Sequence, residues 1–227
     1  MAKLKRYKQV RRSVLDCARA MNGLGINQGM SGNVSARAGT GFIITPSGMD
    51  YDVCTPDDLV WLDLDRPGEA QGGCKPSSEW RFHHDIYANR PDAGAVVHTH
   101  AVHATALACL GEGIPRFHYM VAMAGGDDIR CAPYATYGTQ ELSDHALKAL
   151  TNRKACLLAN HGLLVLDQNL DRALALAVEV ETLARQYLAA RSVGKPKLLT
   201  RAEMALVVDK FKGYGANAQS GPKVEVG

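Results

Sequence analysis

The sequence predicts an α/β fold of the α+β type, in which helices flank one central and mainly antiparallel sheet. Three observations support this prediction. Apolar residues recur with helical periodicity at both ends of the chain. Many short apolar runs, separated by turns rich in glycine and proline, lie between these ends. The chain of 227 residues has no internal repeat and no linker, so we expect a single domain over residues 1–227, with a flexible polar tail from about residue 216.

The elements of the first half follow from periodicity and from capping residues. Apolar residues at steps of three and four predict a first helix, which Asn22-Gly23 ends. In the second helix Ser77 or Ser78 is expected to be the N-cap, with Glu79 in the first turn. The expected segments are a helix at 3–21, a glycine-rich turn at 29–35, a strand at 42–44, a turn at 45–48, a strand at 60–64, a polar hairpin or loop at 65–74, and a helix from 77 to about 89.

The second half alternates strands and helices in the same way. The apolar run from Ala93 to Val97 predicts a buried strand that continues into His98. The other expected segments are a helix at 103–110, short mixed runs at 115–135, a helix at 142–150, strands at 155–159 and 163–166 joined by a turn, a long helix at 170–191 and a last helix at 203–211.

Composition and charge are those of an ordinary soluble enzyme. Apolar residues make up 46% of the chain and charged residues 22%. The net charge of +3 is small and scattered, so neither a nucleic-acid nor a membrane partner is expected. No apolar run is long enough to span a bilayer, and the N-terminus lacks the apolar core of a signal peptide. The six cysteines show no C-x-x-C spacing, which favours free thiols and a cytoplasmic location.

Two histidines at alternate positions of a predicted strand indicate a metal site. Side chains two residues apart on a strand point to the same face, so His98 and His100 project together. His161 lies in a turn between two further apolar runs. Three neutral imidazoles suit zinc and leave a coordination position for water or substrate. Cobalt and manganese accept comparable donors, so the identity of the metal stays open at this point.

Turns rich in glycine and hydroxyl groups predict a phosphate site beside the metal. Backbone N–H groups in such turns, and at a helix N-terminus, favour a bound phosphate. A carboxylate near a metal-bound carbonyl compound can remove a proton from the adjacent carbon, and Glu79 is the candidate for this role. The alternative is a glutamate that only complements the helix dipole. The turn residues concerned are Gly32, Asn33, Ser47, Gly48, Ser77 and Ser78.

Five short motifs together resemble the class II aldolase family of sugar-phosphate enzymes. They are GMSGNVS at 29–35, TPSG at 45–48, PSSE at 76–79, HTH at 98–100 and NHG at 160–162. The resemblance extends from about residue 10 to 215, and further segments between 118 and 136 and at 210–215 are similar to the branch that cleaves L-fuculose 1-phosphate. It implies an aldehyde-lyase that splits this or a similar ketose 1-phosphate reversibly into dihydroxyacetone phosphate and an aldehyde, through a zinc-stabilised enediolate.

The resemblance also implies roles for individual residues. His98, His100 and His161 are expected to bind one zinc ion per subunit. Glu79 is expected to be the acid/base and a further metal ligand before substrate arrives, while Tyr119 of a neighbouring subunit is the proton donor to the aldehyde oxygen. A homotetramer with active sites at its subunit interfaces is implied. The residues expected to bind phosphate or aldehyde are Asn33, Ser47, Gly48, Ser77, Ser78, Tyr137 and Tyr214.

Departures from the family pattern leave the substrate open. Tyr137 stands where the fuculose branch has phenylalanine, and Met30 and Ser31 also depart from it. The alternatives are an aldolase for 5-deoxyribulose 1-phosphate or methylthioribulose 1-phosphate, a sugar-phosphate 4-epimerase, a methylthioribulose-1-phosphate dehydratase, and a non-catalytic interaction module. The remaining histidines that need an interpretation are taken as structural: His83, His84, His103 and His118.

Overall fold

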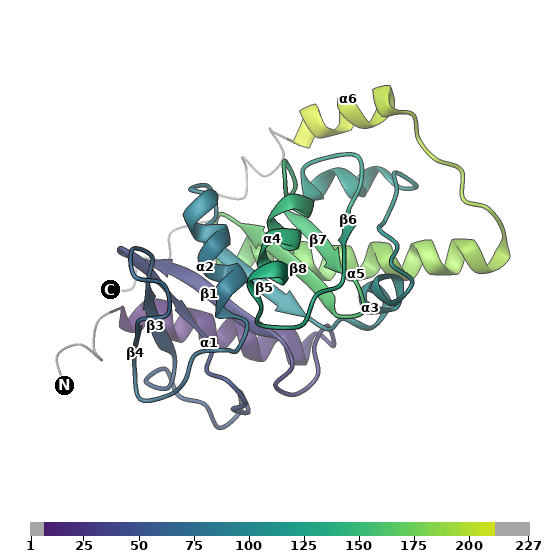
Figure 1. The fold of residues 1–227 in the computed structure, drawn as a ribbon. Coiled ribbons are helices and arrows are strands. Elements are labelled where there is room, and N and C mark those ends of the chain that lie inside the picture. The colour runs from purple at the N-terminus through teal and green to yellow at the C-terminus, as the bar shows by residue number, and fades with distance from the viewer. Residues whose placement is uncertain (1–6, 212–227) are drawn as a thin grey trace, which may run out of the picture.

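A mixed eight-stranded sheet forms the centre of the protein (Figure 1), in a computed structural model that describes residues 7–211. The strand order is β4-β3-β2-β1-β5-β8-β7-β6, and every neighbouring pair is antiparallel except β6 and β7. The predicted fold class is therefore confirmed. The strands are β1 (Asn33–Ala38), β2 (Gly41–Ile44), β3 (Val60–Asp63), β4 (Ala70–Gln71), β5 (Ala95–Thr99), β6 (Arg130–Ala132), β7 (Ala155–Leu158) and β8 (Gly162–Asp167).

Helices cover both faces of this sheet (Figure 1). α1, α3 and α5 pack on one face, and α2 and α4 pack on the other. Alternate residues of β5 point to opposite faces of the sheet. Val97 lies in the core formed with α1, α3 and α5, and Val96 lies in the core formed with α2 and α4. Burial on both faces explains the uninterrupted apolar runs. The helices are α1 (Lys8–Gly23), α2 (Trp80–Asn89), α3 (Val102–Cys109), the 3-10 helix η1 (Tyr119–Ala124), α4 (Gln140–Ala149), α5 (Leu170–Val193) and α6 (Arg201–Phe211).

Two of the observed strands, β1 and β6, were not predicted from the sequence. β1 begins at Asn33, inside the segment expected to be a turn; its residues alternate between polar and apolar, with Val34, Ala36 and Ala38 in the core, a strand pattern that the glycine-rich turn before it obscured. β6 has only three residues, and it is the one strand that joins the sheet in parallel, next to β7. The expected hairpin at 65–74 is present as β4, which pairs with β3.

The expected capping of α2 was wrong. The helix begins at Trp80, and Glu79 is the N-cap residue with no side-chain capping bond. The preceding segment is extended because Pro76 forms an antiparallel bridge with Pro46 and the Ser77 N–H donates to the Thr45 carbonyl at 3.0 Å. The Ser77 hydroxyl instead accepts from the Glu79 N–H at 3.3 Å. Pairing with the 45–48 turn thus delays the start of the helix and brings two of the predicted phosphate-binding turns together.

The part of the chain that the structure describes contains no helix long and apolar enough to cross a membrane. The start of the first predicted helix and the predicted polar tail lie outside the described residues, as does Tyr214.

Candidate metal centre and active site

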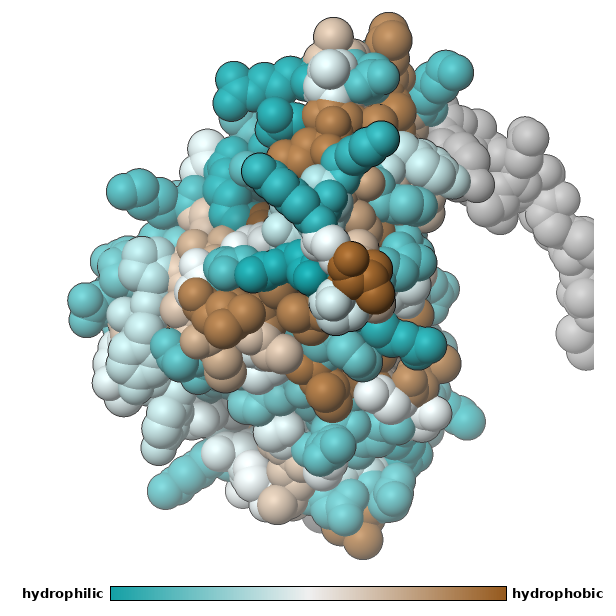
Figure 2. Space-filling model, turned by 90° about the vertical axis from the view of Figure 1, so that its right-hand side faces the viewer, coloured by the Kyte–Doolittle hydropathy of each residue, from teal (hydrophilic) through white to brown (hydrophobic). Residues whose placement is uncertain are grey.

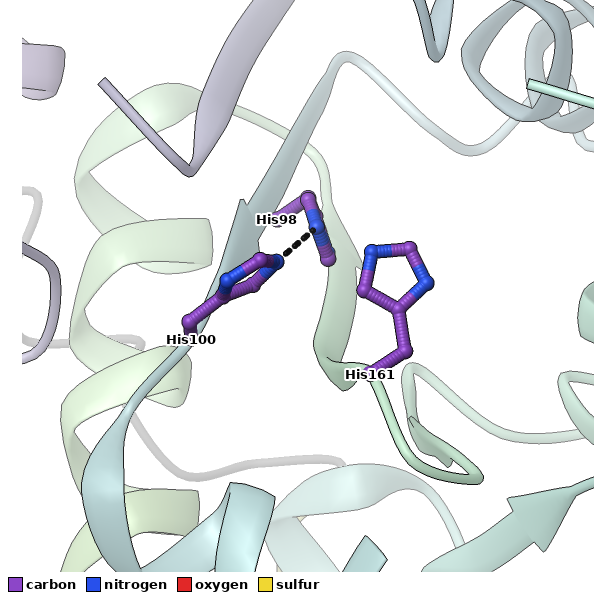
Figure 3. Close-up of side chains that lie close together, drawn as sticks. All are labelled: His98, His100 and His161. Carbon is purple, nitrogen blue, oxygen red and sulfur yellow. Dashed lines mark hydrogen bonds between the residues drawn. The ribbon is translucent and has the colours of Figure 1, made fainter. Parts of the chain in front are cut away.

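Strand pairing brings the three predicted histidine ligands together. His98 is in β5 and His100 follows the end of that strand, while His161 lies in the turn between β7 and β8. β5 pairs directly with β8, with Thr99 opposite Leu163. Figure 3 shows the three imidazoles facing a common point, and one ring nitrogen from each lies within 4.8 Å of the others. The structure therefore places the predicted ligands in one cluster.

The orientation of His98 is fixed by a backbone acceptor. Its Nδ1 lies 2.9 Å from the Leu163 carbonyl oxygen, which can only accept a hydrogen bond. The proton is therefore on Nδ1, and the Nε2 lone pair points into the cluster, the arrangement usual for a metal-ligating histidine. The Nε2 atoms of His98 and His100 are 3.2 Å apart (Figure 3). Two nitrogens on a tetrahedral zinc ion, each at about 2.0–2.1 Å from it, are separated by about 3.3 Å.

His100 is also prepared to act as a neutral ligand. Burial, with the neighbouring His98 and His161 acting in the same direction, lowers the pKa of His100 from 6.5 to about 4. The imidazole is therefore uncharged near pH 7, which is the form that donates electrons to a metal.

Glu79 completes a four-residue cluster. Its Oε2 lies 3.2 Å from Nε2 of His98, and its Oε1 lies 3.1 Å from Nε2 of His161. The side chain is 5% exposed, and the buried Oε1 makes no hydrogen bond with any described residue. Burial alone raises the pKa of Glu79, but the attraction of His98 and His161 outweighs burial and leaves the pKa below its ordinary value.

A divalent cation fits these residues. A buried carboxylate oxygen without a partner, facing imidazole lone pairs, is costly unless a positive charge lies between them. The three histidines supply nitrogen donors, and Glu79 supplies a further oxygen. Three imidazoles with a carboxylate beside them form a donor set that fits a divalent metal.

A cavity of about 300 Å³ opens beside the cluster. This volume is at the lower end of the range for small-molecule sites. Of its lining residues, Ser31, Tyr134 and Asn160 were not predicted as site residues, although each lies within or beside a motif that was noticed. The lining consists of Ser31, Ser78, Glu79, His100, Tyr134, Ala135, Tyr137, Asn160 and His161.

The predicted phosphate-binding turns converge near this cavity. The Ser47 N–H donates to the Lys75 carbonyl at 3.0 Å, which joins the 45–48 turn to the segment before Ser77. Ser47, Gly48 and Ser78 are exposed, whereas Ser77 is buried. The backbone thus brings these residues together beside the end of β2.

Asn33 takes a position that the sequence did not predict. It is 3% exposed, and its Nδ2 donates to Oε2 of Glu79 at 2.9 Å. Its Oδ1 lies 2.5 Å from Nε2 of His83. In the described structure its side chain therefore contacts the carboxylate, and it does not line the cavity.

The two remaining predicted tyrosines differ in location. Tyr137 lines the cavity and is 65% exposed. Tyr119 is in η1 and is 51% exposed, but it does not line the cavity of its own chain.

Comparison with known proteins identifies the family. A model of the "Class II Aldolase and Adducin N-terminal domain" matches residues 12–188. The chain belongs to this family. It is 56% identical over 210 residues to a 5-methylthioribulose-1-phosphate/5-deoxyribulose-1-phosphate aldolase of Rhodospirillum rubrum, covering 92% of this chain and 94% of the relative. It is 51% identical over 205 residues to an L-fuculose phosphate aldolase of Escherichia coli strain K12, covering 90% and 94%.

A solved structure supports the same assignment. An L-fuculose 1-phosphate aldolase superimposes with a TM-score of 0.86 at 40% identity, covering 90% of this chain and 96% of that one. The family resemblance read from the motifs is confirmed, and the protein is an aldehyde-lyase of the class II type. Class II aldolases use a divalent metal, and the cluster of His98, His100 and His161 fits a metal site.

Proposed function

We propose that the protein is a zinc-dependent aldolase that reversibly cleaves a ketose 1-phosphate into dihydroxyacetone phosphate and an aldehyde. The observation that carries this proposal is the position of Glu79. Its carboxylate lies within 3.2 Å of His98 and His161 and also lines the cavity. One group is thus close both to the metal ligands and to the space where a substrate carbon can bind.

The chain's own residues account for the proton transfers. A metal bound by the histidines supplies positive charge that makes the C–H bond beside a ketone more acidic. Glu79 accepts that proton, because Asn33 holds its Oε2 while its Oε1 has no hydrogen-bond partner among the described residues. The resulting enediolate carbon attacks the aldehyde, and a tyrosine hydroxyl donates a proton to the new alkoxide. Cleavage follows the same path in reverse.

The phosphate is expected to bind at the paired turns. Ser47, Gly48 and Ser78 are exposed beside the end of β2, and the hydroxyl groups of the two serines and the Gly48 N–H are the groups expected to contact the phosphate. Ser77 and Asn33 are buried and engage Glu79: the Ser77 hydroxyl accepts from the Glu79 N–H, and Asn33 donates to the Glu79 carboxylate. We assign direct phosphate contacts to Ser47, Gly48 and Ser78, with Ser77 and Asn33 in a supporting role.

We infer that a second copy of the chain completes the site. Tyr119, the predicted proton donor, is half exposed and lies outside the cavity of its own chain. A homotetramer with active sites at its interfaces lets Tyr119 reach the cavity of a neighbour. Figure 2 shows hydrophobic groups in separate patches at the end of the molecule that carries α3 and the C-terminal part of α5. Exposed apolar residues on these elements and the segments that follow them are Val102, Leu110, Val193 and Leu198.

Two substrates are supported by separate observations. L-fuculose 1-phosphate is favoured by the 51% identical relative and by the superimposed structure, both of which carry that name. 5-Deoxyribulose 1-phosphate or its methylthio analogue is favoured by the 56% identical relative. Tyr137 and Asn160 place polar side chains at the cavity and are the residues expected to discriminate between the aldehydes.

The test is cleavage of both sugars by the zinc-loaded protein, with release of dihydroxyacetone phosphate as the readout. We expect release from at least one sugar, and the ratio of kcat/KM values names the preferred substrate. Glu79→Gln and a chelator should each abolish release. The matched control is Glu141→Gln, which changes an exposed glutamate in the first turn of α4 and should leave the rate unchanged. No release from either sugar by the zinc-bound protein would reject the aldolase proposal and favour the epimerase or dehydratase alternative.

A further inference from the structure

A chain of buried polar side chains leads from Glu79 away from the cavity and into the layer between β1 and α2. Asn33 contacts Glu79 at 2.9 Å, and His83 contacts Asn33 at 2.5 Å. Ser35 Oγ then lies 2.6 Å from Nδ1 of His83 and 2.9 Å from the Tyr87 hydroxyl. None of the five side chains belongs to a residue more than 5% exposed, and the residues of His83 and Ser35 are fully buried. Apolar residues of the second core, among them Phe42, Phe82 and Ile86, also lie in this layer.

The two elements place these residues by matching periods. Glu79, His83 and Tyr87 are four residues apart, so they lie on one side of α2 and its N-cap. Asn33 and Ser35 are two residues apart on β1 and share a face. Four residues of helix advance about 6.0 Å and two residues of strand about 6.6 Å, so side chains of the two elements can alternate along the contact.

The donor and acceptor roles along this chain are determined by the carboxylate. An ionised Glu79 can only accept, so Asn33 must present its NH₂ group to it and its Oδ1 to His83. His83 must then carry its proton on Nε2, which leaves Nδ1 to accept from the Ser35 hydroxyl. Ser35 in turn accepts from Tyr87. Every donor in this series points toward Glu79, and each side chain is bonded to the next.

We propose that His83 is a positioning residue for Glu79, acting through Asn33. This inference rests on the proposed role of Glu79 as the proton acceptor. Asn33 is free to rotate by half a turn about its last side-chain bond unless its oxygen is held, and the rotated amide places an acceptor against the carboxylate. The His83 Nε2–H prevents that rotation, which keeps Oε2 bound to Asn33 and Oε1 beside His161.

The geometry supplies a matched pair of variants at one position. In His83→Gln, the longer side chain places its amide near the former Nε2 and can still donate to Asn33. In His83→Asn, the amide lies near the former Nδ1, so the contact with Ser35 is kept and the bond to Asn33 is lost. Both replacements are neutral and polar. His84→Asn is the control, because His84 is also buried on α2 but contacts Asp85 and the Leu64 carbonyl.

The activity readout is exchange of the carbon-bound proton of dihydroxyacetone phosphate with deuterated solvent, without aldehyde. This reaction isolates the step assigned to Glu79. We expect His83→Asn to lower the maximal exchange rate by about tenfold to a hundredfold, the range for loss of a hydrogen bond that serves a charged group. KM should change by less than about threefold. His83→Gln should restore the rate to within about threefold of the parent, and His84→Asn should not change it.

A spectroscopic readout tests the same inference without turnover. Nitrogen chemical shifts of the His83 ring in the metal-free protein should report a neutral ring protonated on Nε2. Protonation on Nδ1 would reverse the donor order and overturn the proposal.

The outcomes separate this inference from the proposed function. If the parent protein exchanges no proton, the proposed function fails, and the His83 tautomer still decides the hydrogen-bond order. If the parent exchanges and folded His83→Asn does so equally fast, the positioning role is wrong. If His83→Asn does not fold, Ser35→Ala replaces it, because loss of one hydroxyl frees the His83 tautomer. Exchange by Ser35→Ala at the parental rate with a mixed tautomer would likewise overturn the proposal.

Discussion

Gly162 lies where the sheet and the metal ligands meet, and Gly162→Ala tests whether their close packing sets metal affinity. Gly162 is the first residue of β8 and directly follows His161. A Cβ added there would lie 2.6 Å from the Thr99 carbonyl oxygen, 3.0 Å from Cδ2 of His100 and 3.4 Å from Cε1 of His98. One methyl group would therefore press against the β5 backbone and the His100 ring, and it would meet the His98 ring at the limit of ordinary contact.

The size of the effect follows from these distances. Ordinary contact begins at 3.4 Å, so the Thr99 carbonyl and the new methyl group must separate by about 0.8 Å. The carbonyl belongs to the paired β5 backbone and cannot move without disturbing its neighbour. Overpacking of this kind costs about 1–3 kcal/mol. In a domain of this size the melting temperature should fall by roughly 2–12 °C, and displacement of the ligand rings should weaken zinc binding by about tenfold to a hundredfold.

Zinc affinity is measured by competition with a chromophoric chelator, and stability by thermal unfolding of the metal-free protein. Gly194→Ala is the control, because a Cβ there meets nothing within 4 Å. It should leave both quantities unchanged. The zinc affinity of Gly162→Ala could instead stay within twofold of the parent, with the melting temperature unchanged. In that case close packing of β5 and β8 does not fix the ligand geometry.

Three further predictions concern pH, metal and substrate. Burial, with His98 adding to it, lowers the pKa of His83 from 6.5 to about 3. The unfolded chain therefore takes up this proton first, and the free energy of unfolding of the metal-free protein should fall by up to about 5 kcal/mol as pH drops from 6.5 to 3. Urea titrations check this, and His83→Gln should flatten the dependence. Removing the metal should lower the melting temperature, and adding zinc should restore it. The reason is that a bound cation stabilises the folded state, in which the Glu79 carboxylate is buried against His98 and His161. Equal melting curves with and without zinc would contradict this prediction. Tyr137→Phe should leave proton exchange on dihydroxyacetone phosphate unchanged but alter the ratio of the two sugar cleavage rates by at least about threefold; an unchanged ratio rules out a role in specificity.

The local part of the site could be predicted from the sequence. His98 and His100 share a face because a strand has a period of two, and that holds in β5 wherever the strand is placed. Helical periodicity likewise marked the positions of α1 and α5. β1 has the period-two alternation of a strand, with Val34, Ala36 and Ala38 in the core, but it was assigned to the glycine-rich turn; only the structure shows that Asn33 and Ser35, on its other face, are buried by hydrogen bonds to His83 on α2.

The residues predicted to bind phosphate show the limit of reasoning from motifs. Asn33 was grouped with exposed turn residues because it follows a glycine. In the structure β1 pairs with β5, with Asn33 opposite His98, and this pairing carries its side chain to Glu79. His83 was interpreted as structural because nothing in the local sequence shows which groups its two ring nitrogens contact.

Residue types and their local faces could be read from the order of the amino acids: two histidines on one side of a strand, a third in a turn, and a carboxylate beside a helix start. Only the tertiary structure decided that these groups meet. Pairing of β5 with β8 brings His161 to the strand histidines, and the packing of α2 on β1 places Glu79 between them and Asn33. The physical reason is that side-chain direction repeats with the backbone's own period, whereas the register between distant segments is set by burial on both faces of the sheet and by the backbone hydrogen bonds that join its strands.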